Sequence, residues 1–130
     1  MEGRMVRRVL LAMVFLAPPA LASGDSPVGL WRTEAVGARQ AYLDVRIAPC
    51  GEALCGTVAA AHNTRKTELV GQVLMTGMLP DGDGGWDSGT IVAPDTGDSY
   101  AGSMRLDGAG LKVKGCIAVF CRSQLWTRLN

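Results

Sequence analysis

Short segments of alternating apolar and polar residues, separated by turn residues, constrain the fold of this chain more than any other feature. In one such segment Leu43, Val45 and Ile47 alternate with Asp44 and Arg46. A period of two places alternate side chains on opposite faces of a strand, so that one face is buried and the other is solvated. The segment therefore predicts a half-buried β-strand.

The same pattern recurs along the chain, with turn signals such as "LPDGDGG", "APDTGDS" and "LDGAG" between the segments. No segment has the pattern of a convincing amphipathic helix. Short, evenly spaced strands predict an all-β fold, and short connections favour a small antiparallel up-and-down barrel. About eight strands are expected, at Leu30–Glu34, Ala41–Ala48, Leu54–Ala61, Leu69–Thr76, Trp86–Val92, Ser99–Leu106, Leu111–Cys116 and Gln124–Leu129.

The first residues have the three parts of a secretory signal peptide. Arg4, Arg7 and Arg8 form a basic segment, Val9–Leu16 is apolar, and small residues lead to a cleavage site after Ala22. An apolar run of about eight residues is far shorter than the roughly 20 needed to span a bilayer. The sequence therefore predicts an exported protein rather than one held by a membrane anchor.

Cleavage would remove residues 1–22 and leave 23–130 as a single domain. Taking three arginines and one glutamate from 13 basic and 12 acidic residues leaves 10 basic and 11 acidic residues. A net charge near −1 gives no basic footprint for nucleic acid and no polybasic patch for anionic lipid. We therefore expect no nucleic-acid partner and no stable membrane anchor after signal cleavage.

The four cysteines form two pairs with equal spacing, Cys50 with Cys55 and Cys116 with Cys121. An exported protein meets an oxidising environment, where paired cysteines normally form disulfides. Zinc sites usually have closer ligand spacing and often include histidine, and redox pairs commonly read Cys-x-x-Cys. The one histidine, His62, is far from both pairs in the sequence and lies in a polar run, so we interpret it as a solvated loop residue rather than a ligand. The sequence therefore favours two disulfides, with metal binding and redox chemistry as the less favoured alternatives.

The two ends of the domain carry a second clue to a barrel. Gly29 and Trp31 form a Gly-x-Trp motif near the start, and Trp126 and Arg128 lie near the end. This resembles the calycin pattern, in which the indole of an N-terminal Gly-x-Trp packs against an arginine of the last strand. The resemblance implies that Trp31, Trp126 and Arg128 close the barrel through a cation–π contact. The alternative is that the tryptophans are half-buried aromatic residues on strands that pair at a sheet edge.

Four blocks in order along the chain resemble the bacterial exported proteins of domain-of-unknown-function family 2147. They are "GLWRT", "VRIAPCGEALCGTV", "GWDSGTIVAPDTGDSYAGSMRLDG" and "LKVKGCIAVFCRSQLWTR". The resemblance covers nearly all of the expected mature chain and implies a calycin-like barrel in the bacterial periplasm or secreted from the cell. It implies no established activity. The chain departs from the family at Ser88, where a glycine would be usual.

Catalytic chemistry has little support in the sequence. Nucleophilic hydrolysis needs a nucleophile and an oriented base, and His62 is the one imidazole available. The motif Gly-x-Ser-x-Gly is absent, and "DGDGGWD" fails the EF-hand pattern because Val92 stands where a bidentate glutamate belongs. We expect no enzyme, no metal site and no cofactor. The aspartates lie in glycine-rich turns, where Asp commonly bonds the backbone: Asp81, Asp83, Asp87, Asp95 and Asp98.

Two functional hypotheses follow. The first is a binding module whose barrel mouth takes a small apolar or amphipathic molecule. The second is a structural or interaction protein of the cell envelope with a filled core. Its partner surface would combine His62, Arg65 and Lys66 of the long segment "AAHNTRKTELVG" with Trp86. An exposed Trp86 would favour the second hypothesis, and a buried one would belong to the core.

Disulfide connectivity gives the first testable prediction. Chain entropy favours crossed pairing, because loops of about 67 residues would contribute roughly 4 kcal/mol each and loops of about six residues roughly 2 kcal/mol. However, each cysteine pair brackets a turn-like segment, which places its sulfurs across the end of one hairpin. We therefore expect Cys50 to bond Cys55 and Cys116 to bond Cys121. Non-reducing peptide mapping tests this, and a peptide that joins Cys50 to Cys116 or Cys121 would disprove it.

Overall fold

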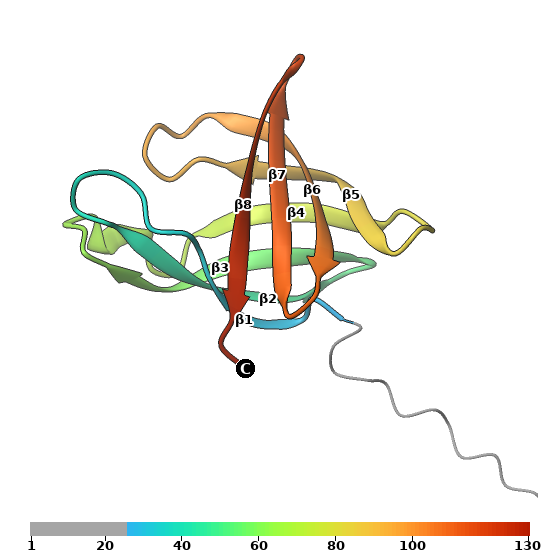
Figure 1. The fold of residues 1–130 in the computed structure, drawn as a ribbon, viewed down its shortest axis with the longest axis horizontal. Helices are drawn as coiled ribbons and strands as arrows, with labels where there is room; N and C mark the ends of the chain where they lie inside the picture. The colour runs from blue at the N-terminus through green and yellow to red at the C-terminus, as the bar shows by residue number, and fades with distance from the viewer. Residues whose placement is uncertain (1–25) are drawn as a thin grey trace, which may run out of the picture.

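The computed structural model describes residues 26–130, so the expected signal peptide, residues 1–22, lies outside the described residues. Eight antiparallel strands form one closed barrel in which each strand pairs with the next and the last pairs with the first (Figure 1). The prediction of an all-β up-and-down barrel of about eight strands is confirmed. The strands are β1 Gly29–Arg32, β2 Tyr42–Cys50, β3 Ala53–His62, β4 Val73–Pro80, β5 Gly85–Val92, β6 Ser99–Asp107, β7 Gly110–Ile117 and β8 Phe120–Arg128.

Two strands begin four residues away from their predicted starts, whereas the other starts agree to within one residue. β4 begins at Val73 instead of Leu69, because Thr67–Leu69 forms a short 3-10 helix, η2, whose Leu69 side chain is buried in the core. β8 begins at Phe120 instead of Gln124, because the β7–β8 ladder continues outward to the pair Ile117 and Phe120. In residues 26–130, no helix is long and apolar enough to cross a membrane.

The period-two pattern places the predicted residues in the core. Leu43, Val45 and Ile47 of β2 are all buried and pack with Trp31, Met75 and other inward side chains. Apolar side chains from the inner faces of the strands thus form a single core inside the barrel.

A row of three glycines crosses β5, β6 and β7, because Gly89 pairs with Gly102 and Gly102 pairs with Gly115. Larger side chains cover each position: a Cβ added at Gly89 or Gly102 would lie 2.7 Å from atoms of Met78 or Ile91. Glycine inside a strand commonly marks a bend or close packing. The row therefore lets the sheet curve tightly while neighbouring side chains fill the space.

Trp31 and Arg128 meet at one end of the barrel, where β1 pairs with β8. The Arg128 Cζ atom lies 4.3 Å from the centroid of the Trp31 ring, and the ring is fully buried. The indole Nε1–H donates to the carbonyl oxygen of Pro27 at 2.8 Å, and Arg128 Nη2 donates to that of Ser26 at 2.6 Å. The first residues described are thereby held across this closed end of the barrel.

The structure places each cysteine pair at disulfide distance across its own hairpin. Cys50 and Cys55 lie at the β2–β3 turn, and Cys116 and Cys121 are direct partners in the β7–β8 ladder. These positions are the ones that local pairing requires.

Ser88, where the family resemblance implies glycine, has a left-handed backbone conformation with φ of +65°. It lies in β5 where the register with β6 shifts between Trp86 and Gly89, so the strand bulges there. The left-handed conformation costs a residue with a Cβ about 1–2 kcal/mol, and glycine avoids most of this cost. The departure from the family thus falls where a glycine would be conformationally favoured.

We expect Ser88→Gly to raise the free energy of unfolding by about 0.5–1 kcal/mol, because relief of the left-handed strain exceeds the added entropy of the unfolded chain. Urea unfolding followed by circular dichroism measures the change. Ser103→Gly, in β6 at a position without positive φ, is the matched control and should destabilise the protein. A Ser88→Gly variant no more stable than the parent would contradict the strain argument.

Candidate functional site

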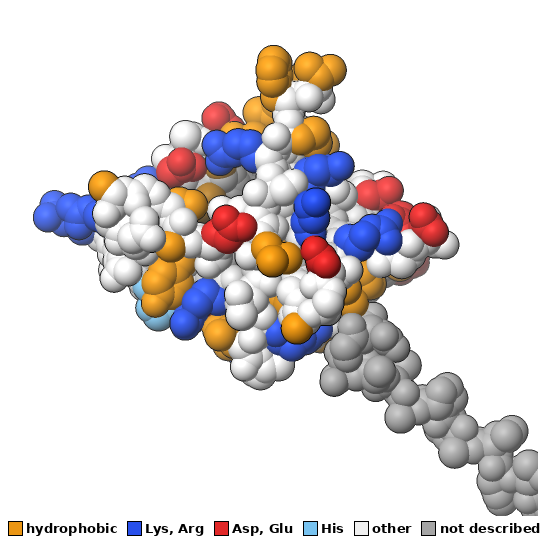
Figure 2. All heavy atoms as spheres, viewed as in Figure 1, with side chains coloured by type: hydrophobic (Ala, Val, Ile, Leu, Met, Phe, Trp, Pro, Cys, Tyr) orange, Lys and Arg blue, Asp and Glu red, His pale blue; other side chains and the backbone are white. Residues whose placement is uncertain are grey.

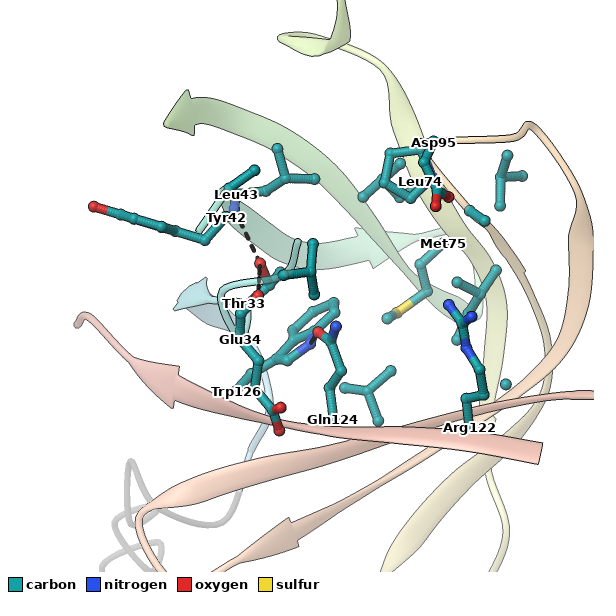
Figure 3. A pocket seen from close by; sticks show the side chains of 18 of the residues that line it. Thr33, Glu34, Tyr42, Leu43, Leu74, Met75, Asp95, Arg122, Gln124 and Trp126 are labelled. Carbon is teal, nitrogen blue, oxygen red and sulfur yellow. Dashed lines mark hydrogen bonds between the residues drawn. The ribbon is translucent and has the colours of Figure 1, made fainter. Parts of the chain in front are cut away.

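A cavity of about 810 Å³ occupies the end of the barrel opposite the Trp31–Arg128 contact (Figure 3). Its mouth is bordered by the β1–β2, β3–β4 and β5–β6 loops and by the first residues of β8. The strand side chains that line its interior are mostly apolar: Leu43, Leu74, Met75, Ile91, Val113 and Trp126. The barrel interior is therefore filled at one end and hollow at the other.

Trp126 belongs to the cavity and not to the contact with Arg128. Its side chain is buried, and its Nε1–H donates to Gln124 Oε1 at 2.9 Å. A buried indole N–H that lacked a partner would be costly, and Gln124 removes that cost. Of the three residues expected to close the barrel, the structure brings Trp31 and Arg128 together and places Trp126 in the cavity wall.

The mouth carries two basic side chains, Arg122 and Lys66. Figure 3 shows Arg122 reaching from β8 toward the side of the cavity where Met75 lies. The Arg122 Cζ atom lies 6.0 Å from the centroid of the Tyr100 ring, a long cation–π distance. Within residues 26–130 no carboxylate is close enough to Arg122 to form a salt bridge.

Lys66 has a different environment from Arg122. Its Nζ donates to the backbone carbonyl oxygen of Asp95 at 3.3 Å, and the Asp95 residue also borders the mouth. Glu34, a further acid at the mouth, accepts a hydrogen bond from the backbone N–H of Leu125. Arg122 is therefore the rim cation with the greatest capacity to take up a new anionic partner.

His62 lies outside the cavity, in a polar cluster on the outer face of β1, β2 and β3. Its Nε2 atom is 2.9 Å from Asp44 Oδ2, and its ring stacks on Tyr42 with centroids 4.6 Å apart. Arg32 Nε donates to Asp44 Oδ1 at 2.9 Å and Arg32 also covers the Tyr42 ring. The sequence interpretation of His62 as a solvated loop residue is wrong, because β3 extends to His62 and places it beside Asp44.

The polar cluster stabilises the ionised form of Asp44. The Asp44 residue is 8% exposed, and this burial raises the pKa of its carboxyl. Hydrogen bonds from Arg32 and His62 outweigh the effect of burial, so the pKa of Asp44 lies below its ordinary value. The polar cluster thus links three strands through Arg32 of β1, Asp44 of β2 and His62 of β3, and these three residues are called the clasp below.

The four residues expected to form a partner surface do not lie on one surface. His62 belongs to the clasp, Arg65 is exposed in the β3–β4 loop, and Lys66 borders the cavity mouth. Trp86 lies near the closed end, where it is half-buried against the core and pairs with Pro80 and Met104. Trp86 thus packs against the core and is not the exposed tryptophan that a partner surface would present.

Asp81 has the backbone role expected for an aspartate in a glycine-rich turn. Its Oδ1 accepts from the N–H groups of Asp83 at 2.7 Å and Gly85 at 3.0 Å, and these bonds hold its pKa below the ordinary value. Arg105 Nη2 also donates to Asp81 Oδ2 at 3.3 Å. The Asp81 carboxyl therefore fixes the turn between β4 and β5.

Comparison with known proteins shows where this barrel belongs. Residues 29–128 match the family model described as "Uncharacterized protein conserved in bacteria (DUF2147)". The chain belongs to the DUF2147 family. Comparison with curated proteins finds none that matches.

Among solved structures, this DUF2147 protein is similar to protein HP1028 from Helicobacter pylori, which is described as belonging to the lipocalin family. The TM-score is 0.66 with 10% sequence identity, over 81% of this chain and 84% of that chain. At this identity the likeness shows the fold, a lipocalin-like barrel. The family and the calycin-like fold expected from the sequence motifs are therefore confirmed.

Sequence reasoning missed Arg122 and Gln124 as cavity residues, although a signal for them was present. Both lie an even number of residues before Trp126, and an inward Trp126 implies that Gln124 and Arg122 lie on the same face of β8. Polar residues on an otherwise inward face indicate a solvent-filled end of a barrel. The late predicted start of β8, at Gln124, obscured this alternation for Arg122.

The clasp predicts how stability depends on acid. Because the folded pKa of Asp44 is depressed, its contribution to stability is complete above the ordinary Asp pKa of about 3.9 and is lost as the pH falls through the folded value. We expect Asp44→Asn to lower the free energy of unfolding near neutral pH and to remove this part of its pH dependence. Urea unfolding measured from pH 6 down to pH 3 tests the expectation.

Asp107→Asn, at the exposed last residue of β6, is the matched control and should keep the parental slope of stability against pH. Equal slopes for Asp44→Asn and the parent protein would refute the role of the clasp.

Proposed function

We propose that this DUF2147 protein binds one small amphipathic molecule, with an apolar body in the cavity and an anionic head at Arg122. The observation that carries this proposal is a hollow apolar barrel end with a cation at its rim that forms no salt bridge within residues 26–130. An apolar wall offers burial to the body of the ligand, and a guanidinium offers a directed partner to its head.

The size of the cavity supports a small ligand. Pockets that bind small molecules commonly have volumes of about 300–1,000 Å³, and this cavity measures about 810 Å³. Eight-stranded barrels hold either side chains alone or one small ligand. The strands have at most 10 residues, so the barrel is shallow and favours a short chain over a long lipid. A protein with a filled core, the alternative hypothesis, would not need this space.

The head group is proposed to be anionic because of the donors at the rim. A guanidinium can bond a carboxylate, a sulfonate or a phosphate with two parallel hydrogen bonds. Asp95 and Glu34 lie on the same rim and would repel a second negative charge. A single anionic group on an apolar chain, such as a medium-chain carboxylate, fits this arrangement best.

We propose binding rather than catalysis, because the one histidine is part of the polar cluster and is not available as a base in the cavity. His62 bonds Asp44, stacks on Tyr42 and lies outside the residues that line the cavity.

Export to the periplasm or beyond the cell is part of the same proposal. It is supported by the bacterial family and by the two cysteine pairs at disulfide distance.

The test compares two ligands that share an apolar chain and differ in charge, decanoate and decanol. We expect both to bind with apolar burial, and Arg122→Gln to weaken decanoate binding by about tenfold while changing decanol binding by less than about twofold. Isothermal titration calorimetry measures both affinities in the parent protein and the variant. Measurements at several ionic strengths should show that salt weakens the decanoate complex only.

The matched control is Arg46→Gln, which removes an exposed arginine from the outer face of β2. It should leave both affinities unchanged. The absence of binding for either ligand would overturn the binding proposal, and an equal loss for both in Arg122→Gln would overturn the assignment of the head group to Arg122.

A further inference from the structure

The turn between β7 and β8 presents the two most exposed large apolar side chains that the structure describes, Val119 and Phe120, with Ile117 beside them. Val119 is 85% exposed, Phe120 is 77% exposed and Ile117 is 46% exposed. The hairpin rises beyond the rest of the barrel in Figure 1, and Figure 2 shows apolar side chains at the end of the same projection. These three side chains, with Ala118, are called the hairpin tip below.

Folding gives no reason for the apolar residues of the hairpin tip. Two-residue β-turns need positive φ, and glycine or asparagine commonly provides it. Here Ala118 has φ of +55°, a conformation unfavourable for alanine, and Val119 follows it in the turn. The paired cysteines 116 and 121 hold the strands together just behind this turn. The hairpin is thus fastened by its cysteines while its turn presents apolar side chains to solvent.

Basic side chains lie behind the hairpin tip. The β7–β8 ladder ends at the pair Ile117 and Phe120. Lys114 lies three residues before Ile117 and Arg122 lies two residues after Phe120, while Lys112 is further from the turn in β7. At about 3.3 Å per residue these positions are roughly 7–10 Å behind the tip. The sequence from residue 108 to residue 130 contains no Asp or Glu. The projection therefore has an apolar end, and all the charged residues of its two strands are basic.

We propose that the hairpin tip docks reversibly into the interfacial region of an anionic phospholipid bilayer. Apolar groups at a membrane surface are buried about 5–10 Å into the boundary between headgroups and acyl chains. With the tip at that depth, Lys114 and Arg122 lie level with the lipid phosphates, where each basic residue attracts anionic lipid. The expectation of no polybasic patch for anionic lipid was based on the net charge of the whole domain, whereas the fold brings Lys112, Lys114 and Arg122 together on one hairpin.

A bilayer fits the hairpin tip better than a protein partner does. The tip is narrow and convex, with three large apolar side chains, whereas stable protein interfaces bury about 800 Å² on each partner. A fluid lipid bilayer needs no complementary pocket, so the apolar side chains of the hairpin tip can insert between its headgroups. The basic residues behind the tip, Lys112, Lys114 and Arg122, are also complementary in charge to anionic headgroups.

Docking would bring the cavity mouth to the membrane. Gly115, Arg122 and Ser123 line the cavity and lie on the same hairpin as the tip. An amphipathic ligand of the proposed kind could then pass between the bilayer and the barrel without crossing water. The docking itself needs no ligand, so it is tested separately from the proposed function.

The experiment is sedimentation of the protein with vesicles, using residues 23–130 with the disulfides intact, so that the apolar leader contributes nothing. Vesicles contain either equal parts of phosphatidylglycerol and phosphatidylcholine or phosphatidylcholine alone. We expect binding to the anionic vesicles that weakens with added salt, and weaker binding to the neutral ones. The double variant Val119→Ser, Phe120→Ser should lower affinity for the anionic vesicles by about tenfold or more.

Two further variants separate the contributions. Lys114→Gln should lower affinity for anionic vesicles by about fivefold and leave the weak binding to neutral vesicles unchanged. Leu79→Ser, an exposed leucine near the closed end of the barrel, is the matched apolar control and should bind as the parent does. All variants are first compared with the parent by thermal unfolding to establish that they fold.

Absence of binding to anionic vesicles, or equal binding by the parent and the double tip variant, would overturn the proposal. Concentration-dependent self-association that the tip variant abolishes, without vesicle binding, would overturn it in favour of a second copy as the partner. Decanoate affinity measured on the same double variant keeps the two proposals distinct, since neither Val119 nor Phe120 lines the cavity.

Discussion

The contact between Arg128 and Trp31 is the interaction on which the rest of this barrel depends. β1 has four residues and pairs with β8 at two positions, so the ladder that closes the sheet is short. The Arg128 guanidinium compensates by covering the buried indole and by bonding the carbonyl oxygens of Ser26 and Val28. Without this closure the eight strands would form an open sheet with two unpaired edges, and the cavity would have no wall between β1 and β8.

The packed closed end stabilises the barrel, so the fold tolerates a cavity at the other end. The buried side chains of Trp31, Met78 and Met104 do not line the cavity and pack the closed half, where apolar burial stabilises the fold. The open half is held by polar contacts of its loops, such as the bond from the Leu43 N–H to Thr33 Oγ1 at 2.9 Å and that from the Leu125 N–H to Glu34. Those loops can therefore keep their positions without an apolar plug, and the space between them stays accessible.

The fold could be predicted from the sequence because its determinants are local. Period-two alternation and the turn residues between segments each involve a few neighbouring residues, and they predicted the strand number and the topology. The Trp31–Arg128 contact joins the two ends of the domain, and it was expected from the resemblance to the calycin pattern. The cavity could not be predicted in this way, since its volume depends on how inward side chains from eight strands add up in space. The pairing of His62 with Asp44 was missed for a similar reason: it depends on cross-strand register near a β-bulge at Asp44.

Two departures from good folding chemistry lie two residues apart on the β7–β8 hairpin, next to the rim cation Arg122. Ala118 has a left-handed backbone, and Phe120 is exposed. Each is a small cost to stability, and the paired cysteines beside them limit their combined effect. Residues that are unfavourable for folding are commonest at sites where a protein binds a ligand or a partner. This concentration links the rim of the cavity to the apolar tip, so we infer that ligand entry and surface docking use the same hairpin.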